Sequence, residues 1–374
     1  IGQPTRPVGS IWPGVTTAQA IRAGNFDVDM VAGVTDSMTR PDDLIVTTAE
    51  SATEENPDQA RLVLFHEDNH DLISFSINGV KPGDSPMYAA VGEFDLEPYS
   101  AAALDVVFLT RYPPGAPPRW LVQVMLGNMK GAFTTTSADV GPIKPLPVDW
   151  ELQPMQLKAY PLRRPLKKFL EGDLSQPDLM LINRLTRDVT LFLGMGFGLF
   201  QDKTLGSHDF SAGGNPIDVT AGYLQARIDE QLDDALAANL LPDLVTLVPS
   251  HVLVDYSLDR QTLKDMGEDI GFEPPHALAV TGNSPVAVEV ADMNVDGMYD
   301  IVVLDSASSV VQVFPNLGQR RFAAPYLYPA GKTPVSMSIA DVDADGCPDV
   351  VTADREGRTV STLHNSTQLC RDGE

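Results

Sequence analysis

The sequence predicts an all-β fold, a six-bladed β-propeller of four-stranded antiparallel blades, with seven blades as the alternative count. Two observations carry this prediction. A strand-like word that begins with Asp recurs six times along the 374 residues, and each copy lies between further strand-like runs. Internal repetition of this kind is typical of solenoids and propellers. Four short antiparallel strands per repeat match one propeller blade.

The six Asp words begin 49 to 73 residues apart, at Asp43, Asp105, Asp178, Asp243, Asp300 and Asp349. Most are rich in β-branched and other apolar residues, as buried strands are. A run such as PVAVEVAD from Pro285 predicts the strand before each word, and a run such as SVVQVFP from Ser309 predicts the strand after it. The run RRFAAPYLYPAG from Arg320 predicts the fourth strand. Two stacked sandwiches would also use many short strands, but they need no such repetition.

The repeats predict a single domain over residues 1–374. The approximate repeats are 17–83, 84–153, 154–215, 216–284, 285–333 and 334–374, with a closing strand within 1–16. The sixth repeat ends after its third strand, and the segment from Ser10 aligns with the segment from Tyr326, which contains a fourth strand. We therefore expect the N-terminal strand to complete the last blade and remove an open edge. Repeats 2 and 4 are long enough to hide a seventh blade, and the stretch from Tyr223 predicts a helical insertion.

Composition excludes several classes of function. The formal net charge is −25, which argues against nucleic acid or an anionic membrane as a partner, because both require a basic surface. The apolar runs are too short to cross a bilayer. The two cysteines, Cys347 and Cys370, are compatible with one disulfide in an oxidising compartment. The chain begins at Ile1 without a leader segment, so we expect a processed or shortened form of a secreted, cell-surface or periplasmic protein.

The strongest chemical pattern lies between the first and second strands of repeats 5 and 6. The loops read DMNVDGMYD and DVDADGCPD, with oxygen-bearing side chains at positions 1, 3, 5 and 9, Gly at 6 and a backbone carbonyl at 7. Hard oxygen ligands on a flexible loop favour Ca²⁺ over Mg²⁺. An EF-hand is rejected, because position 12 is not Glu and strands flank the loops. The predicted ligands are Asp292, Asn294, Asp296, Met298 and Asp300 in one loop, and Asp341, Asp343, Asp345, Cys347 and Asp349 in the other.

Two further loops keep the alternating oxygens but lack the glycine. Repeat 1 offers Asn25, Asp27, Asp29 and Asp43, and repeat 2 offers Glu93, Asp95, Glu97 and Asp105. They raise the expected number of calcium ions from two to as many as four, with solvated turns as the alternative. In repeats 3 and 4 only Asp178 and Asp243 remain, so we expect no calcium there and interpret these aspartates as caps of a turn.

The loop D-x-[DN]-x-D-G-x-x-D followed by an Asp-initiated strand resembles the FG-GAP and VCBS repeats of integrin α-subunit propellers and bacterial integrin-like surface proteins. Repeats 5 and 6 match this pattern well, repeats 1 and 2 match it with insertions, and repeats 3 and 4 match only in their strands. The resemblance implies a propeller whose calcium sites stiffen loops on one face, with partners bound on the other face or at the central opening. Integrin propellers have seven blades, and this chain has six repeats.

Three motifs are interpreted as structural. His66-Glu67-Asp68-Asn69-His70 matches the zinc motif H-E-x-x-H, which requires a helix, but it lies in a predicted hairpin. Gly194-Met195-Gly196-Phe197-Gly198 lies in the equivalent hairpin of repeat 3 and lacks the βαβ context of a dinucleotide site. The basic run from Arg163 to Lys168 is interpreted as solvated stems, with an anion site as the alternative. The alignment of the repeats predicts that the stretch from Pro165 forms an innermost strand that brings a lysine near the centre.

The resulting expectation is a calcium-binding, non-enzymatic adhesion or binding module for a protein or glycan. A propeller hydrolase or lyase with a site in the channel and a structural spacer are the alternatives. The second-to-third connections of repeats 1 and 2, 50–59 and 111–120, are unusually long. Loops on a rigid scaffold often carry recognition, and the second connection holds residue types common at binding hot spots: Arg111, Tyr112, Arg119 and Trp120. Tolerated surface insertions are the alternative.

Overall fold

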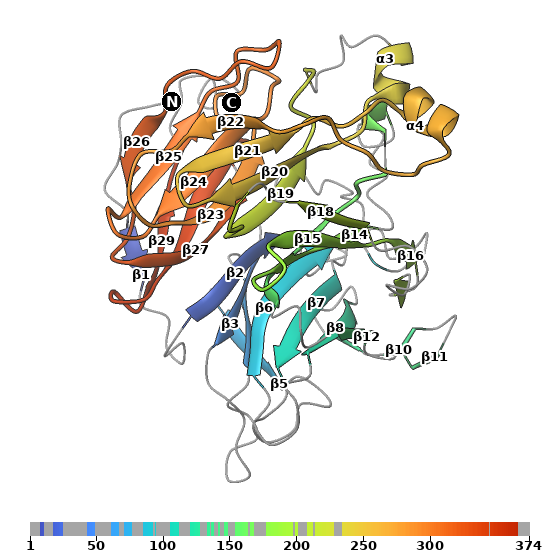
Figure 1. Cartoon of the computed structure of the whole chain (residues 1–374). Coiled ribbons are helices and arrows are strands. Elements are labelled where there is room, and N and C mark those ends of the chain that lie inside the picture. The colour runs from blue at the N-terminus through green and yellow to red at the C-terminus, as the bar shows by residue number, and fades with distance from the viewer. Residues whose placement is uncertain are drawn as a thin grey trace, which may run out of the picture.

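The structure is a computed structural model of the whole chain. It describes residues 8–10, 18–24, 43–48, 61–66, 71–76, 85–92, 94, 105–111, 120–127, 133–134, 136–137, 141–142, 146–148, 154–163, 165–167, 177–196, 199–200, 208–211, 214–227, 234–343 and 345–365. These residues are dominated by antiparallel strands (Figure 1). The predicted all-β class is therefore confirmed.

The first three sheets each begin with the strand nearest the centre. The first is β2 (Ala18–Gly24), β3 (Asp43–Thr48), β4 (Arg61–His66) and β5 (Asp71–Ser76). The second is β6 (Ser85–Gly92), β7 (Asp105–Arg111), β8 (Trp120–Gly127) and β12 (Leu146–Val148), with β9 (Phe133–Thr134) also on β8. The third is β13 (Pro154–Tyr160), β14 (Asp178–Asn183), β15 (Asp188–Phe192) and β18 (His208–Ser211).

The remaining three sheets repeat this order. The fourth is β19 (Asp218–Gly222), β20 (Asp243–Val248), β21 (His251–Asp255) and β22 (His276–Ala279). The fifth is β23 (Pro285–Ala291), β24 (Asp300–Asp305), β25 (Val310–Phe314) and β26 (Tyr326–Pro329). The sixth is β27 (Pro334–Ala340), β28 (Asp349–Asp354), β29 (Thr359–Leu363) and β1 (Val8–Ser10). All six Asp words therefore form the second strand of a sheet.

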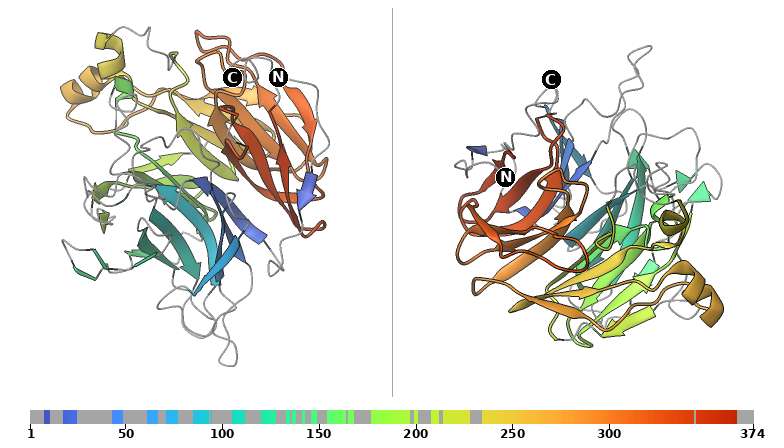
Figure 2. Two further views of the ribbon diagram at one scale, coloured as in Figure 1. Left: turned by 180° about the vertical axis from the view of Figure 1, so that it is seen from behind. Right: turned by 90° about the horizontal axis from the view of Figure 1, so that it is seen from above.

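The first strands of these sheets form a ring. Each of β2, β6, β13, β19, β23 and β27 contacts the first strands of the two neighbouring sheets, and β27 contacts β2. The sheets follow one another around the molecule in chain order when it is seen from above (Figure 2). This arrangement of separate four-stranded sheets around a common axis is that of a β-propeller.

The N-terminal strand closes the last sheet, as predicted. β1 pairs antiparallel with β29, with Val8 opposite Thr362 and Ser10 opposite Val360. The two strands come from opposite ends of the chain and lie side by side in Figure 1. This pairing covers the outer edge of β29, which would otherwise offer unpaired backbone groups to another chain.

The core consists of apolar layers between consecutive sheets. One cluster joins the second and third sheets through Val107 and Leu181, and another joins the third and fourth through Ile182 and Val219. Further clusters join the fourth to the fifth and the fifth to the sixth. In the third to sixth sheets the second strands are buried on both faces, which explains why their Asp words are almost continuously apolar.

Insertions account for the long repeats. The second repeat adds β9 and a ribbon of β10 (Thr136–Ser137) and β11 (Gly141–Pro142), and the third adds a hairpin of β16 (Gly194–Gly196) and β17 (Leu199–Phe200). The fourth adds α3 (Asp234–Asn239), within the predicted helical stretch, and α4 (Arg260–Met266). The described residues form no further four-stranded sheet.

Candidate metal loops and the aspartate clamps

The aspartate that opens each second strand is deeply buried. Wherever the structure describes its burial, this side chain is at most 1 % exposed: Asp105, Asp178, Asp243, Asp300 and Asp349. A charged carboxylate in such a position needs hydrogen-bond donors to offset the loss of water. The same two kinds of backbone donor recur in successive sheets.

In the fourth sheet, Asp243 accepts a hydrogen bond from the Leu224 N–H at 2.9 Å and from the Ser257 N–H at 2.8 Å. Leu224 lies just after the first strand and Ser257 just after the third. One carboxylate thus fixes both loops on that side of the sheet. We call this arrangement an aspartate clamp, and it confirms the interpretation of Asp243 as a cap.

The fifth and sixth sheets have the same clamp. Asp300 accepts from the N–H groups of Met293 (3.2 Å) and Asn316 (2.8 Å). Asp349 accepts from the equivalent pair, Val342 (3.2 Å) and Asn365 (2.7 Å). The aspartate at position 9 of each predicted calcium loop therefore has a structural role of its own, and its presence alone does not indicate a metal.

The sheets differ in the residue at position 3 of the loop after the first strand, with positions counted as in the predicted calcium loops. In the third sheet this position is Arg163, whose guanidinium pairs with Asp178 at 2.7 Å and also donates to the Gly194 carbonyl. In the fourth sheet it is Gln225, which donates to Asp243 at 2.7 Å. In the fifth and sixth sheets it is Asn294 or Asp343, side chains that offer oxygen instead. The anion-site alternative for the basic run therefore loses Arg163, which is already paired.

The loop of the fifth sheet curls around its own side chains. Asp292 accepts from the N–H groups of Asp296 (2.9 Å) and Gly297 (2.7 Å). Asp296 in turn accepts from the N–H of Met298 at 2.8 Å. Gly297 has a φ of 83°, a left-handed value that glycine adopts without a steric penalty. The oxygens of positions 1, 3 and 5 therefore turn inward, as the pattern predicts.

The loop of the sixth sheet repeats this geometry with one more carboxylate. Asp341 accepts from the N–H groups of Asp345 (3.1 Å) and Gly346 (2.9 Å), and Gly346 has a φ of 82°. Carboxylate oxygens of Asp341, Asp343 and Asp345 lie within 4.8 Å of one another. Such a group is suited to a cation that takes six to eight oxygen ligands.

Burial and neighbouring carboxylates raise the pKa of aspartates in both loops. Burial, together with the nearby carboxylates of Asp296 and Asp292, raises the pKa of Asp300 to about 7. Burial also raises the pKa of Asp349 to about 6, with Asp343 adding to the effect. Burial likewise raises the pKa of Asp292 and Asp345. A cation among these groups would favour their charged forms.

Asparagines that sequence reasoning missed connect adjacent sheets. The Asn316 side chain donates to the carbonyls of Leu224 in the previous sheet and Tyr299 in its own, both at 3.0 Å. Asn365 donates in the same way to the Met293 carbonyl at 2.8 Å. The signal was present as an Asn soon after the third strand in repeats 5 and 6, in VFPN and TLHN.

A charged cluster on the innermost strands was also missed. Lys158 on β13 pairs with Glu289 on β23, two sheets away, and lies 3.5 Å from Asp218 on β19. Because β19 separates β13 from β23, this ion pair spans the inside of the ring. The expected lysine belonged to the stretch from Pro165, whereas the lysine found inside the ring, Lys158, lies before that stretch. The assignment of the stretch from Pro165 to an innermost strand is wrong, because β13 ends at Tyr160 and the chain turns there.

The other predicted residues fall partly outside the described part of the chain. Asp43 and Asp105 open β3 and β7, and Asp105 accepts from the Phe94 N–H at 2.7 Å. Arg111 and Trp120 are opposite one another at the ends of β7 and β8. Nothing is described for Asn25, Asp27, Asp29, Glu93, Asp95, Glu97, Tyr112 and Arg119.

The H-E-x-x-H motif and the glycine-rich motif both occur in hairpins. His66 ends β4 and pairs with Asp71, the first residue of β5, so the H-E-x-x-H segment connects two antiparallel strands. Gly194 and Gly196 lie in β16, which pairs with β17. Cys347 is buried and disulfide-bonded, and the only other cysteine, Cys370, lies outside the described residues.

A family model described as an FG-GAP-like repeat matches residues 292–352, which contain both glycine-bearing loops. No curated protein matches the sequence. Among solved structures, a mutant of the α-L-arabinofuranosidase Arb93A from Fusarium graminearum, in complex with an iminosugar inhibitor, is 12% identical with a TM-score of 0.51 and 92% of each chain covered. Virginiamycin B lyase from Staphylococcus aureus is 8% identical with a TM-score of 0.48, covering 96% of this chain and 99% of the other.

The fold and the clamps define a β-propeller. Its fifth and sixth sheets carry the FG-GAP-like repeat, as the resemblance in the sequence implied. None of the described helices has the length and apolar character required to span a membrane.

Proposed function

We propose that this chain is a calcium-stabilised β-propeller that acts as an extracellular or cell-surface binding module for a protein or a glycan. Calcium binding is proposed mainly because the residue at position 3 differs between the sheets. Where Arg163 or Gln225 provides a donor to the clamp, the D-x-[DN]-x-D-G pattern is missing. Where position 3 is an oxygen ligand, the loop carries acidic side chains at positions 1, 5 and 9. In the sixth sheet the carboxylates of Asp341, Asp343 and Asp345 lie within 4.8 Å of one another. Among the described residues, the ion pairs of these loops involve His364 and no Lys or Arg.

The donor set fits calcium in kind and number. Each loop offers carboxylate or amide oxygens at positions 1, 3 and 5, and the clamp aspartate at position 9 keeps lone pairs beyond its two backbone hydrogen bonds. The carbonyl at position 7, of Met298 or Cys347, is the further ligand that the pattern predicts. Ligands at alternate positions of a flexible loop suit the variable coordination of calcium better than the strict octahedron of magnesium.

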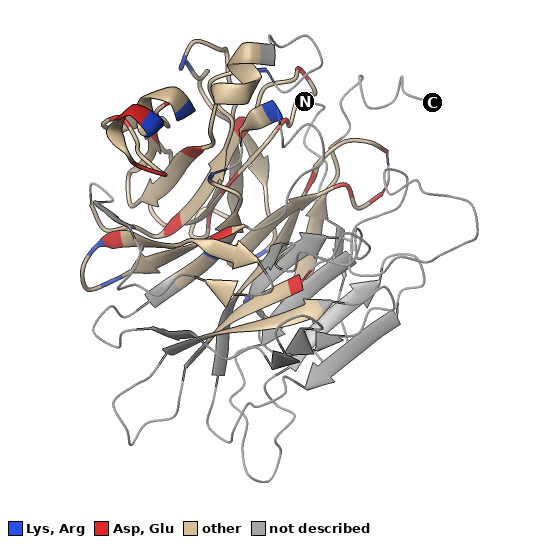
Figure 3. Ribbon diagram, turned by 90° about the vertical axis from the view of Figure 1, so that its right-hand side faces the viewer, with Lys and Arg blue, Asp and Glu red and all other residues tan. Residues whose placement is uncertain are grey.

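The binding role rests on the distribution of charge and loops. Asp and Glu number 51 against 26 Lys and Arg, and acidic positions are spread over the described ribbon (Figure 3). This disfavours nucleic acid and anionic lipid. The FG-GAP-like match and the disulfide at Cys347 favour an oxidising location outside the cytosol. The acidic surface and the calcium loops support a partner that is a protein or a glycan.

The rival enzymatic function would centre on Lys158, Glu289 and Asp218, which lie inside the ring. Lys158 contacts both carboxylates, and Asp218 also accepts from the N–H groups of Val219 and Val288 at 2.9 Å. A base or nucleophile needs a free lone pair at the reacting atom. The cluster therefore favours a lock between sheets, and a turnover assay on glycosides and lactones tests the rival directly.

We expect calcium to raise the thermal unfolding midpoint of the full chain by several degrees, because an ion that binds only the folded state stabilises it by mass action. The measurement is thermal unfolding after chelation, with and without added calcium, together with metal content by mass spectrometry. In the double variant Asp296→Asn and Asp345→Asn, an amide keeps the acceptor for Met298 and Cys347 but removes the charge, so the calcium response should be lost.

Asp269→Asn is the matched control, because this exposed carboxylate lies outside both loops. It should keep the full calcium response. An unchanged midpoint in the wild type with no bound calcium would refute the calcium part of the proposal, whatever the control shows.

The binding role predicts a specific effect of the long connections 50–59 and 111–120. Arg111 and Trp120 belong to β7 and β8, and residues 50–59 and 112–119 lie outside the described residues. The connections join second and third strands and the calcium loops join first and second strands, so we expect the two kinds of loop at opposite ends of the sheets. Screening the full chain against immobilised glycans and cell-surface proteins, with and without chelator, should identify a partner. Shortening both connections to tight turns should then abolish binding while the calcium-dependent melting stays intact. Retained affinity in that variant would place the binding surface elsewhere.

A further inference from the structure

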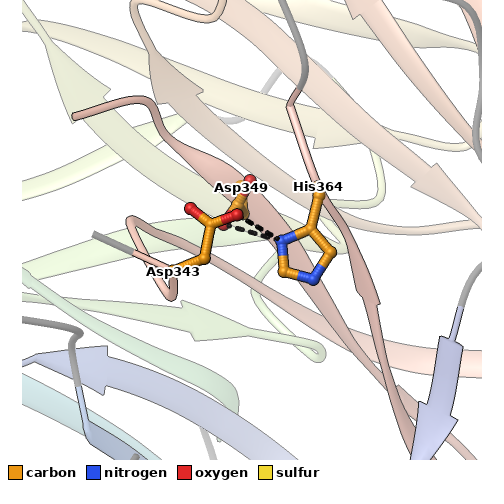
Figure 4. A group of neighbouring side chains, drawn as sticks. All are labelled: Asp343, Asp349 and His364. Carbon is orange, nitrogen blue, oxygen red and sulfur yellow. Dashed lines mark ion pairs between the residues drawn. The ribbon is translucent and has the colours of Figure 1, made fainter. Parts of the chain in front are cut away.

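The loop of the sixth sheet has a nitrogen ligand that the loop of the fifth lacks. His364 follows β29 directly, and its Nδ1 lies 3.1 Å from an Asp343 oxygen and 3.4 Å from an Asp349 oxygen. Figure 4 shows the imidazole Nδ1 and the two carboxylates directed at one another. The three ligand atoms lie within 4.8 Å of each other.

These separations match the distance between neighbouring ligand atoms around a small metal ion. A zinc ion binds imidazole nitrogen and carboxylate oxygen at about 2.0–2.2 Å in a tetrahedron, so neighbouring ligand atoms should be about 3.3–3.5 Å apart. Both distances from Nδ1 are close to this value. The side chains of His364 and Asp343 are 42% and 41% exposed, so solvent reaches the group and a water can serve as the fourth ligand.

The equivalent position in the fifth sheet cannot contribute in this way. The N–H groups of Asn316 and Asn365 bond to the same oxygen of their clamp aspartates, so the residues before them correspond. They are Pro315 in the fifth sheet and His364 in the sixth. Position 3 also differs, because Asn294 is neutral and Asp343 is a carboxylate. The two loops are therefore chemically unequal in spite of their shared pattern.

We propose that Asp343, Asp349 and His364 form a site for a first-row transition dication such as zinc, distinct in its ligand set from the all-oxygen loop of the fifth sheet. Imidazole suits zinc, copper and nickel, whereas calcium prefers oxygen alone. Because Asp343 and Asp349 also belong to the calcium ligands of that loop, zinc and calcium compete there. In this last respect the inference rests on the proposed function, while zinc binding itself does not require it.

The experiment uses the chelator-treated full chain and measures the binding of zinc chloride alone by equilibrium dialysis. We expect His364→Gln to weaken zinc binding by more than about tenfold, since even outer-shell partners of a metal change affinity 10- to 100-fold. Calcium binding by the same variant should stay within about twofold, because the glutamine adds no charge and the carboxylates remain. His251→Gln is the matched control, since the ring of this histidine bonds to the neighbouring Ser250 and lies far from the loop in sequence.

Cobalt substitution and competition complete the test. Cobalt bound to the wild type should give the visible absorption of a nitrogen-ligated site, and His364→Gln should lose that band. Zinc should displace one equivalent of calcium from a calcium-loaded chain. Zinc binding unchanged by His364→Gln, or zinc bound without any loss of calcium, would overturn the inference and leave the calcium proposal standing. Absence of calcium binding together with a zinc site sensitive to His364 would overturn only the calcium proposal.

Discussion

Replacing Asp243 by alanine is expected to destabilise the protein by about 3–5 kcal/mol, although this residue lies in a sheet without a calcium loop. Its carboxylate accepts hydrogen bonds from the N–H groups of Leu224 and Ser257 and from the Gln225 side chain, and it is fully buried. Each buried donor left without an acceptor costs about 1–3 kcal/mol. Urea unfolding measures the change as a shift in midpoint at constant slope.

Two control variants test whether the lost hydrogen bonds of Asp243 cause the destabilisation. Asp243→Asn keeps one carbonyl oxygen and should lose roughly half of the effect. Asp265→Ala, on the exposed face of α4, should change the free energy of unfolding by less than about 0.5 kcal/mol. If Asp243→Ala matched Asp265→Ala, the clamp would not hold the loops, and the whole account of position 9 would fail.

The same residue gives a pH dependence whose sign follows from its pKa. Burial raises the pKa of Asp243 to about 6, and the hydrogen bonds from Ser257, Gln225 and Leu224 only partly offset this. Because the folded value lies above the unfolded value, the folded state binds this proton more tightly. The resulting stability is present below about pH 4 and is lost as the pH rises through 6. The free-energy difference between wild type and Asp243→Asn should therefore decrease from about pH 4 to pH 7.

The sequence was most informative where each repeat carries its own pattern. The Asp words predicted every second strand. In the fourth, fifth and sixth sheets these strands are buried on both faces and their aspartates form the same clamp. Closure by the N-terminal strand was predicted because the sixth repeat lacks a fourth strand and the segment from Ser10 resembles one. Local periodicity and turn chemistry were sufficient for these elements.

Contacts between residues of different repeats could not be predicted from the sequence. Nothing in PMQLKAY distinguishes Lys158 from a solvated lysine, because its partners are 60 and 131 residues later in the chain, Asp218 and Glu289. The contribution of His364 was hidden for the same reason, since it joins the loop from the far end of the third strand. Helix α4 carries a sequence signal of its own, because Asp259 is its N-cap and Gly267 its C-cap.

Replacing Lys158 by methionine is the second change with a large expected effect, about 3–5 kcal/mol of lost stability. The side chains of Lys158 and Asp218 are 7% and 0% exposed, and that of Glu289 is 18% exposed. Removing one partner of a buried ion pair leaves an uncompensated charge, which costs far more than the pair itself contributes. Because the three residues lie on β13, β19 and β23, the loss should loosen three sheets together. Thermal or urea unfolding measures it.

Lys332→Met is the matched control, since Lys332 pairs with Glu356 at 3.0 Å but the two side chains are 74% and 56% exposed. Exposed pairs contribute about 0–1 kcal/mol, so the same substitution should have little effect there. Adding Glu289→Gln to Lys158→Met should restore part of the stability, because it removes one of the two stranded charges, while Glu289→Gln alone should destabilise. If the double variant were as unstable as the sum of the single ones, Lys158 and Glu289 would not be coupled, and the lock across the ring would have to be abandoned.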